Sequence, residues 1–161
     1  MRIKIFLSIL FLILSVSVSL AQKSKRASNV VAREGVGLNG LRVGRSTRSD
    51  VIRKYGRGFK FIKNGKYSFQ MKYANGLSFY YCQSDKVQRV FVIEMRSPFR
   101  GKTAKGIVLG RSTLAEVRKR YGRAKVGLRY RGVEFYYARY RGKKIVSVID
   151  IVEKKGLRQC N

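Results

Sequence analysis

The chain of 161 residues has no histidine and no tryptophan, a single proline, two cysteines and only eight acidic residues. Without histidine it has no Ser-His or Cys-His nucleophile pair, no imidazole base and no His-ligated zinc. Two cysteines alone also leave a four-ligand zinc site incomplete. These absences predict a protein that is not an enzyme and that holds no cofactor and no metal.

Basic residues are abundant. The chain has 37 Lys and Arg residues, a formal net charge of +29 and a pI near 11.0. Hydrophobic residues make up 45% of the chain and aromatic residues 12%, which is more than a disordered basic tail would carry. The composition therefore predicts a folded protein that attracts anions.

Residues 1–21 have the pattern of a secretory signal peptide. Arg2 and Lys4 precede an apolar stretch, and the small residues Ser19 and Ala21 stand where cleavage before Gln22 requires them. The apolar stretch, of about 16 residues, is shorter than the roughly 20 that span a bilayer. We therefore expect an exported protein, periplasmic or secreted, with no integral membrane span after cleavage.

Export changes the interpretation of the two cysteines, Cys82 and Cys160. An even number of cysteines in an oxidising compartment usually pairs, so we expect a disulfide between them. In the loop-entropy model such a link contributes about 4 kcal/mol to stability. The alternative is two separate thiols.

A segment of the chain occurs twice. Residues 44–57 recur as residues 110–123, with eight of 14 positions identical, which indicates an internal duplication. Residues 76–81 recur as 132–137, so the offset falls from 66 to 56. The second copy is therefore about ten residues shorter after its repeated segment.

Each copy contains the Thr-x-x-Asp/Glu spacing of a helix capping box. The motif predicts helices over Arg48 to Tyr55 and Leu114 to Tyr121, ended by Gly56 and Gly122. The same helix starts, Gly44 to Thr47 and Gly110 to Thr113, could instead cradle a phosphate. The Thr side chains are the favoured occupants of those amides.

Alternating apolar residues after each helix predict three strands per copy. These are residues 67–73, 77–82 and 87–95 in the first copy, and residues 126–130, 133–140 and 145–152 in the second. We therefore expect an α+β fold after the signal peptide, with two tandem helix-plus-three-stranded-meander repeats forming one domain with antiparallel sheet. Its parts are a flexible basic lead-in at residues 22–39, repeat 1 at 40–95, a linker at 96–106 and repeat 2 at 107–161.

The Asn75-Gly76 dipeptide predicts the first hairpin turn. A two-residue turn pairs Met71 with Tyr80, whereas a turn one residue longer exchanges the two faces of the strand. Both registers stay open at this point.

The repeated motif consists of hydrophobic-x-hydrophobic-Gly, Thr-x-x-Asp/Glu-Val and Tyr-Gly. It runs from Leu41 to Gly56 and again from Ile107 to Gly122. It resembles the tandem module of the SmpA/OmlA (BamE-like) lipoproteins and of the beta-lactamase inhibitor protein family. The resemblance implies an envelope or secreted protein without catalysis that binds other proteins through its sheet or loops.

Candidate partner-binding residues are basic side chains interleaved with tyrosines in the second copy, together with one tyrosine of the first. Arginines pair with carboxylates and phosphates, and tyrosines stack on rings. The set is Arg118, Lys119, Arg120, Arg129, Arg131, Tyr136, Arg139, Tyr140, Arg141 and Tyr80. Among these, Tyr80, Tyr136 and Tyr140 are expected to be exposed.

We therefore expect a non-enzymatic binding module that docks an acidic protein surface or an anionic envelope polymer. The alternatives are a nucleic-acid-binding protein, which export disfavours, and an envelope assembly or structural component. A basic surface without specific function is also compatible with the composition. Glu134 and Asp150 form a conceivable catalytic carboxylate pair, but a salt bridge to a neighbouring arginine is the favoured interpretation.

Overall fold

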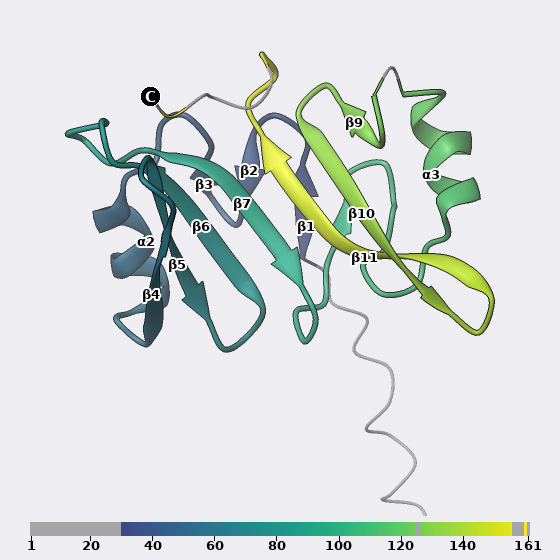
Figure 1. The fold of residues 1–161 in the computed structure, drawn as a ribbon, viewed down its shortest axis with the longest axis horizontal. Coiled ribbons are helices and arrows are strands. Elements are labelled where there is room, and N and C mark those ends of the chain that lie inside the picture. Colours follow the sequence, from purple (N-terminus) through teal and green to yellow (C-terminus); the bar gives the residue numbers. More distant parts are fainter. Residues whose placement is uncertain (1–29, 125, 156–159, 161) are drawn as a thin grey trace, which may run out of the picture.

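The computed structural model describes residues 30–124, 126–155 and 160. The predicted signal peptide and residues 22–29 lie outside the described residues. The described part is mostly β-structure, with a four-stranded sheet, a seven-stranded sheet and two short helices (Figure 1).

The smaller sheet is built from strands of two or three residues. They are β1 (Val31–Arg33), β2 (Gly37–Leu38), β3 (Leu41–Arg42) and β8 (Lys102–Thr103), in the order β3-β2-β1-β8. Within it β1 pairs in parallel with β8. The flexible lead-in predicted up to Asn39 is therefore wrong from Val31 onward, because Ala32 and Leu38 are buried in the core. The predicted linker likewise contains a strand, β8.

The larger sheet has the order β4-β5-β6-β7-β11-β10-β9. All of its neighbouring strands pair antiparallel. Its strands are β4 (Phe59–Asn64), β5 (Ser68–Tyr73), β6 (Leu77–Cys82), β7 (Val90–Arg96), β9 (Arg129–Tyr130), β10 (Val133–Tyr140) and β11 (Lys143–Val152).

The predicted α+β class, with two tandem helix-plus-three-stranded-meander repeats, is wrong. The strands of the two copies merge into one sheet because β7 pairs with β11, with Met95 opposite Ile149. Two further differences raise the β content. The first copy has an extra strand, β4, and the short segments before each helix form the second sheet. The observed fold is a mostly β protein of two sheets.

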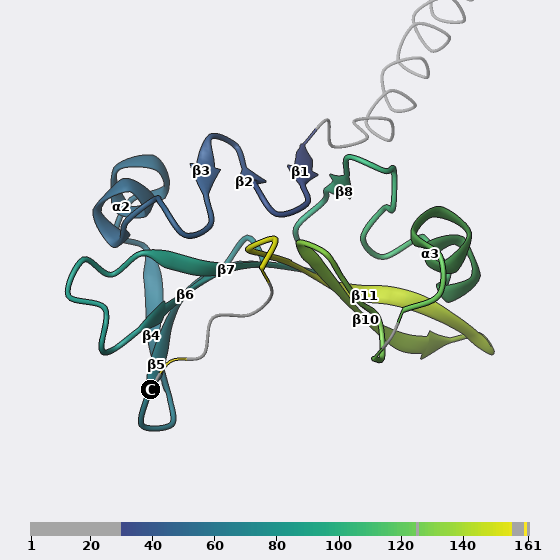
Figure 2. The ribbon, with the colours of Figure 1, turned by 90° about the horizontal axis from the view of Figure 1, so that it is seen from above.

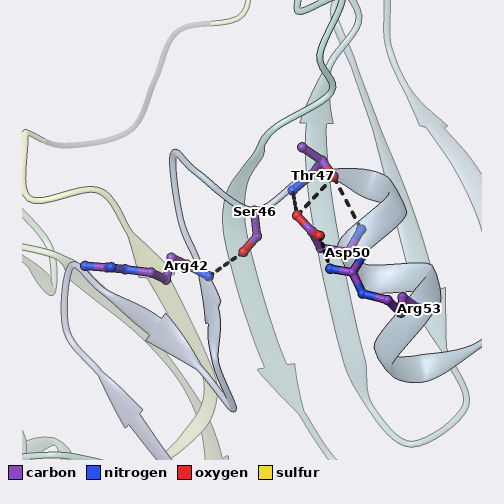
Figure 3. A network of polar contacts seen from close by, with 5 residues as sticks. All are labelled: Arg42, Ser46, Thr47, Asp50 and Arg53. Carbon is purple, nitrogen blue, oxygen red and sulfur yellow. Dashed lines mark hydrogen bonds and ion pairs between the residues drawn. The ribbon is translucent and has the colours of Figure 1, made fainter.

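The two helices are α2 (Arg48–Tyr55) and α3 (Leu114–Tyr121), with the predicted bounds. The Thr47 N–H donates to Asp50 Oδ2 at 2.8 Å and the Asp50 N–H donates to Thr47 Oγ1 at 3.3 Å (Figure 3). Thr113 and Glu116 repeat this capping box in α3. Both predicted boxes are thus confirmed. Neither helix of the described part is long and apolar enough to cross a membrane.

Gly56 ends α2 with φ of 78°, and Gly122 ends α3 with φ of 81°. These angles lie in the region that favours glycine, which explains why each helix stops there. The Tyr73 hydroxyl donates to the Gly56 carbonyl at 2.8 Å, and the Tyr130 hydroxyl donates to the Gly122 carbonyl at 3.0 Å. A tyrosine of the large sheet thus ties down the end of each helix.

The register of the β5–β6 hairpin is the longer-turn alternative. Met71 lies opposite Phe79 and Gln70 lies opposite Tyr80. The Asn75 side chain accepts a hydrogen bond from the Leu77 N–H at 3.1 Å, which stabilises a local turn around Gly76. Apolar side chains therefore share the inner face, and Tyr80 lies on the outer one.

The small sheet and both helices cover one face of the large sheet (Figure 2). The main core lies between these layers. The small sheet contributes Ala32 and Leu38, and the helices contribute Val51 and Val117. The inner face of the large sheet contributes Phe69, Met71, Phe79, Tyr81, Ile93, Met95, Val133, Phe135, Ile149 and Ile151.

Candidate functional site

The elements α3, β9 and the β10–β11 hairpin form one end of the molecule (Figure 1), and this end carries many exposed cations. This region is called the basic end below. The predicted residues Arg118, Lys119 and Arg120 lie exposed on α3. Arg120 also donates to the Lys105 carbonyl at 2.9 Å, so part of its role is to hold α3 against the loop after β8.

The remaining predicted cations of the basic end are also exposed. Arg131 lies in the turn before β10, Arg139 lies on β10 and Arg141 lies in the turn that follows. Tyr136 is 45% exposed and Tyr140 is 63% exposed. The Arg141 guanidinium stands 5.4 Å from the centre of the Tyr140 ring, a cation–π distance. These positions agree with the predicted solvent-facing surface.

An open pocket lies between α3 and β10. Its wall includes Leu114 and Arg118 from the helix, Arg129 from β9, Phe135 and Tyr137 from β10, and Lys144 from β11. The wall combines apolar surface with three cations. Only Arg129 of these three has an ion pair within the described residues, at 3.4 Å to Glu134. Arg118 and Lys144 therefore leave positive charge available to a ligand.

Tyr80 does not belong to the basic end. Its side chain is half-buried, its hydroxyl donates to Glu94 at 3.1 Å, and its ring centre lies 6.2 Å from that of Phe91. Its burial raises the pKa of the hydroxyl, and the nearby Glu94 charge acts in the same direction. The expectation of an exposed aromatic at this position is therefore wrong.

Three carboxylates lie side by side on the outer face of the large sheet. Glu94, Asp150 and Glu134 are directly opposite one another on β7, β11 and β10. The pKa of Asp150 is raised to about 8, chiefly by burial and also by the charges of Glu94 and Glu134, while the charge of Arg96 acts in the opposite direction. The central carboxyl is therefore mostly protonated at neutral pH.

The two outer carboxylates each have an arginine and a tyrosine as partners. Glu94 contacts Arg96 at 3.2 Å and accepts the Tyr80 hydroxyl. Glu134 contacts Arg129 and accepts the Tyr136 hydroxyl at 3.2 Å. These partners satisfy the buried charges, which is the usual arrangement for structural carboxylates.

The conceivable Glu134–Asp150 catalytic pair gains no support from this geometry. Glu134 is held by Arg129, and Asp150 does not line the pocket. Among the described residues, no group of three or more His, Cys, Asp or Glu side chains is placed to hold a metal ion. At the helix starts, Thr47 and Thr113 accept hydrogen bonds from the Asp50 and Glu116 amides, as the favoured capping interpretation predicts.

The predicted disulfide between Cys82 and Cys160 is present, with a Cα–Cα distance of 5.2 Å. It fixes the C-terminal part of the chain to the end of β6. Cys82 packs there with Phe91, Val92 and Val152 in a small apolar cluster. A disulfide is consistent with an oxidising compartment.

Comparison with protein-family models, with curated proteins and with solved structures finds no match to this chain. The chemistry of the basic end therefore has to carry the functional proposal.

The predicted partner-binding set includes Arg118, Arg129 and Tyr136 of the pocket wall, but it leaves out other members of the wall, among them Leu114, Phe135, Tyr137 and Lys144. The pocket lies in the second copy, where the chain after the helix is about ten residues shorter. That length difference was the available signal, because missing strand residues leave part of a neighbouring strand uncovered.

Proposed function

We propose that the protein is an exported, non-enzymatic binding protein that docks an acidic partner through the basic end. The predicted signal peptide and the disulfide support export. The resemblance of the repeated motif to BamE-like and beta-lactamase inhibitor protein-like modules supports a binding role rather than catalysis.

The observation that carries the proposal is the unpaired charge of the basic end. Within the described residues, the one ion pair of the basic end is that of Arg129 with Glu134. The other exposed cations of its helix, strands and turns are Arg118, Lys119, Arg120, Arg131, Arg139, Arg141 and Lys143. Placing these charges close together costs Coulombic free energy that an acidic partner would offset.

The test is binding of the purified, disulfide-bonded protein to immobilised polyglutamate over a range of salt concentrations. Arg139→Ala with Arg141→Ala should weaken binding severalfold, and added salt should weaken it further. The matched control removes two exposed cations from the α2 region, Lys54→Ala with Arg57→Ala, and should have a smaller effect.

Equal loss in both double variants would mean that net charge alone drives the binding, and would contradict a site at the basic end. A DNA duplex of equal charge concentration distinguishes the nucleic-acid alternative. Markedly tighter binding to DNA than to polyglutamate would favour that alternative.

A further inference from the structure

The two copies differ at the edge of the large sheet. In the first copy, β5 covers β6 over five paired positions, from Ser68 opposite Cys82 to Lys72 opposite Ser78. In the second copy, the corresponding strand β9 pairs with β10 only at Val133 and Glu134. Figure 1 shows the β10–β11 hairpin extending well beyond β9.

The uncovered part of β10 has backbone groups that point away from β11. The Phe135 N–H donates to the Leu128 carbonyl at 3.2 Å, on the β9 side of the strand. Because backbone direction alternates along a strand, the N–H groups of Tyr137 and Arg139 point to the same side. Within the described residues, Tyr137 and Arg139 pair with β11 on one side, and β9 does not reach them on the other side.

The first copy shows the strand contact that the second copy lacks. Gln83 is the counterpart of Arg139 at the offset of 56, and its N–H donates to the Tyr67 carbonyl at 2.8 Å. In the described part of the second copy, no residue offers the Arg139 N–H a carbonyl in the way that Tyr67 does for Gln83. The shorter second copy thus leaves a strand-sized position beside Tyr137 and Arg139, and the pocket next to α3 opens onto it.

We propose that this position receives an extended acidic segment of a partner protein, which adds to β10 as an antiparallel or parallel strand. The inference deepens the proposed function and rests on it. Backbone hydrogen bonds to Tyr137 and Arg139 would supply affinity, as in other cases of strand addition. Apolar side chains at alternate positions of the segment would enter the pocket beside Leu114 and Phe135.

The cations around the open edge of β10 favour an acidic segment as its occupant. Arg118, Arg129 and Lys144 line the pocket, and Arg139 lies on the open strand itself. An acidic strand would neutralise these cations. A second copy of this chain would instead place Arg139 and Arg141 beside the same residues of its partner, and basic side chains on an edge strand oppose such pairing.

The experiment compares two peptides of equal charge by fluorescence anisotropy. One alternates Glu and Val and can form a strand, and the other is the same sequence with a methyl group on every backbone nitrogen, so that it lacks the N–H groups that strand pairing needs. We expect the Glu-Val peptide to bind the wild-type protein about tenfold more tightly, as expected for a few net hydrogen bonds.

Arg139→Pro removes the outward N–H and the charge, whereas the matched control Arg139→Ala removes the charge alone. We expect Arg139→Pro to abolish the preference for Glu-Val, and Arg139→Ala to weaken both peptides while keeping the preference. Hydrogen exchange of wild-type protein supplies a readout that does not depend on the proline variant folding. The Tyr137 and Arg139 amides should become protected when Glu-Val binds.

The outcomes separate the two proposals. Equal affinity of wild-type protein for both peptides overturns strand addition and leaves the proposed function standing. Failure of both peptides and of polyglutamate to bind overturns the proposed function itself. Self-association of the free protein that protects the Tyr137 and Arg139 amides would identify a second copy as the occupant, and would also overturn the proposal.

Discussion

Asp150 on β11 lies directly opposite Glu94 on β7, within a basic protein that has only eight acidic residues. Glu134 lies on the other side of Asp150. Like charges on adjacent strands repel, and burial adds a desolvation cost. The proton on Asp150 relieves both effects, which is why the pKa of its carboxyl rises to about 8.

The first prediction is a free energy of unfolding that falls as pH rises between about 4 and 8. The folded state keeps the Asp150 proton up to about pH 8, whereas the unfolded chain releases it near the ordinary value of 3.8. The unfolded state therefore binds fewer protons in that window, and alkalinity favours unfolding. Asp150→Asn should flatten this slope and raise stability at pH 8.5, as measured by urea unfolding.

The control for this prediction is Asp50→Asn. The hydrogen bonds from Thr47 lower the pKa of Asp50, so its contribution to stability has the opposite sign and is lost as pH falls through the folded-state pKa. An Asp150→Asn variant less stable than the wild type at pH 8.5 would contradict the assignment of the proton to Asp150.

The second prediction concerns the disulfide. Cys82→Ser with Cys160→Ser should lower the free energy of unfolding by about 4 kcal/mol, because the bond closes a long loop in the unfolded chain. The two residues are separated by 78 positions. Thermal unfolding with and without reductant measures the effect. Reductant should destabilise the wild type and leave the double variant unchanged.

The third prediction concerns the capping boxes. Thr113→Ala should destabilise the protein by about 1 kcal/mol, because the Glu116 N–H loses its acceptor. Thr113→Ser keeps an oxygen in place and should cost much less. Denaturant unfolding compares the two variants, and equal losses would show that the methyl group rather than the cap matters.

The fourth prediction concerns the tyrosines that bind the helix ends. Tyr73→Phe and Tyr130→Phe should each cost about 1 kcal/mol, since each removes one hydrogen bond to a glycine carbonyl. Tyr140→Phe serves as the control, because its ring is largely exposed, and should change stability little. A similar loss in all three variants would argue against the helix-end contacts.

Much of the local structure could be predicted from the sequence. The bounds of α2 and α3 depend on contacts within four residues of the chain, such as that between Thr113 and Glu116. These local signals survive in any tertiary setting. The strands with long alternating patterns, such as β10 and β11, were also predicted, and the composition indicated the disulfide and the excess of exposed cations.

Pairings between distant segments could not be predicted. The β1 and β2 strands have two or three residues each, too few for a periodic pattern. The pairing of β7 with β11, which merges the two copies, follows from packing of both strands on one shared core. The row of Glu94, Asp150 and Glu134 exists only through that pairing.

The sequence by itself thus determined the duplication, the helix caps, the cysteine pair and the abundance of positive charge, because each depends on composition or on short spacings. Only the tertiary structure decided that one sheet unites the copies and that β10 keeps an uncovered edge beside Arg118 and Lys144. Those features depend on which distant strands pair, and strand pairing is set by burial of the common core rather than by any local pattern.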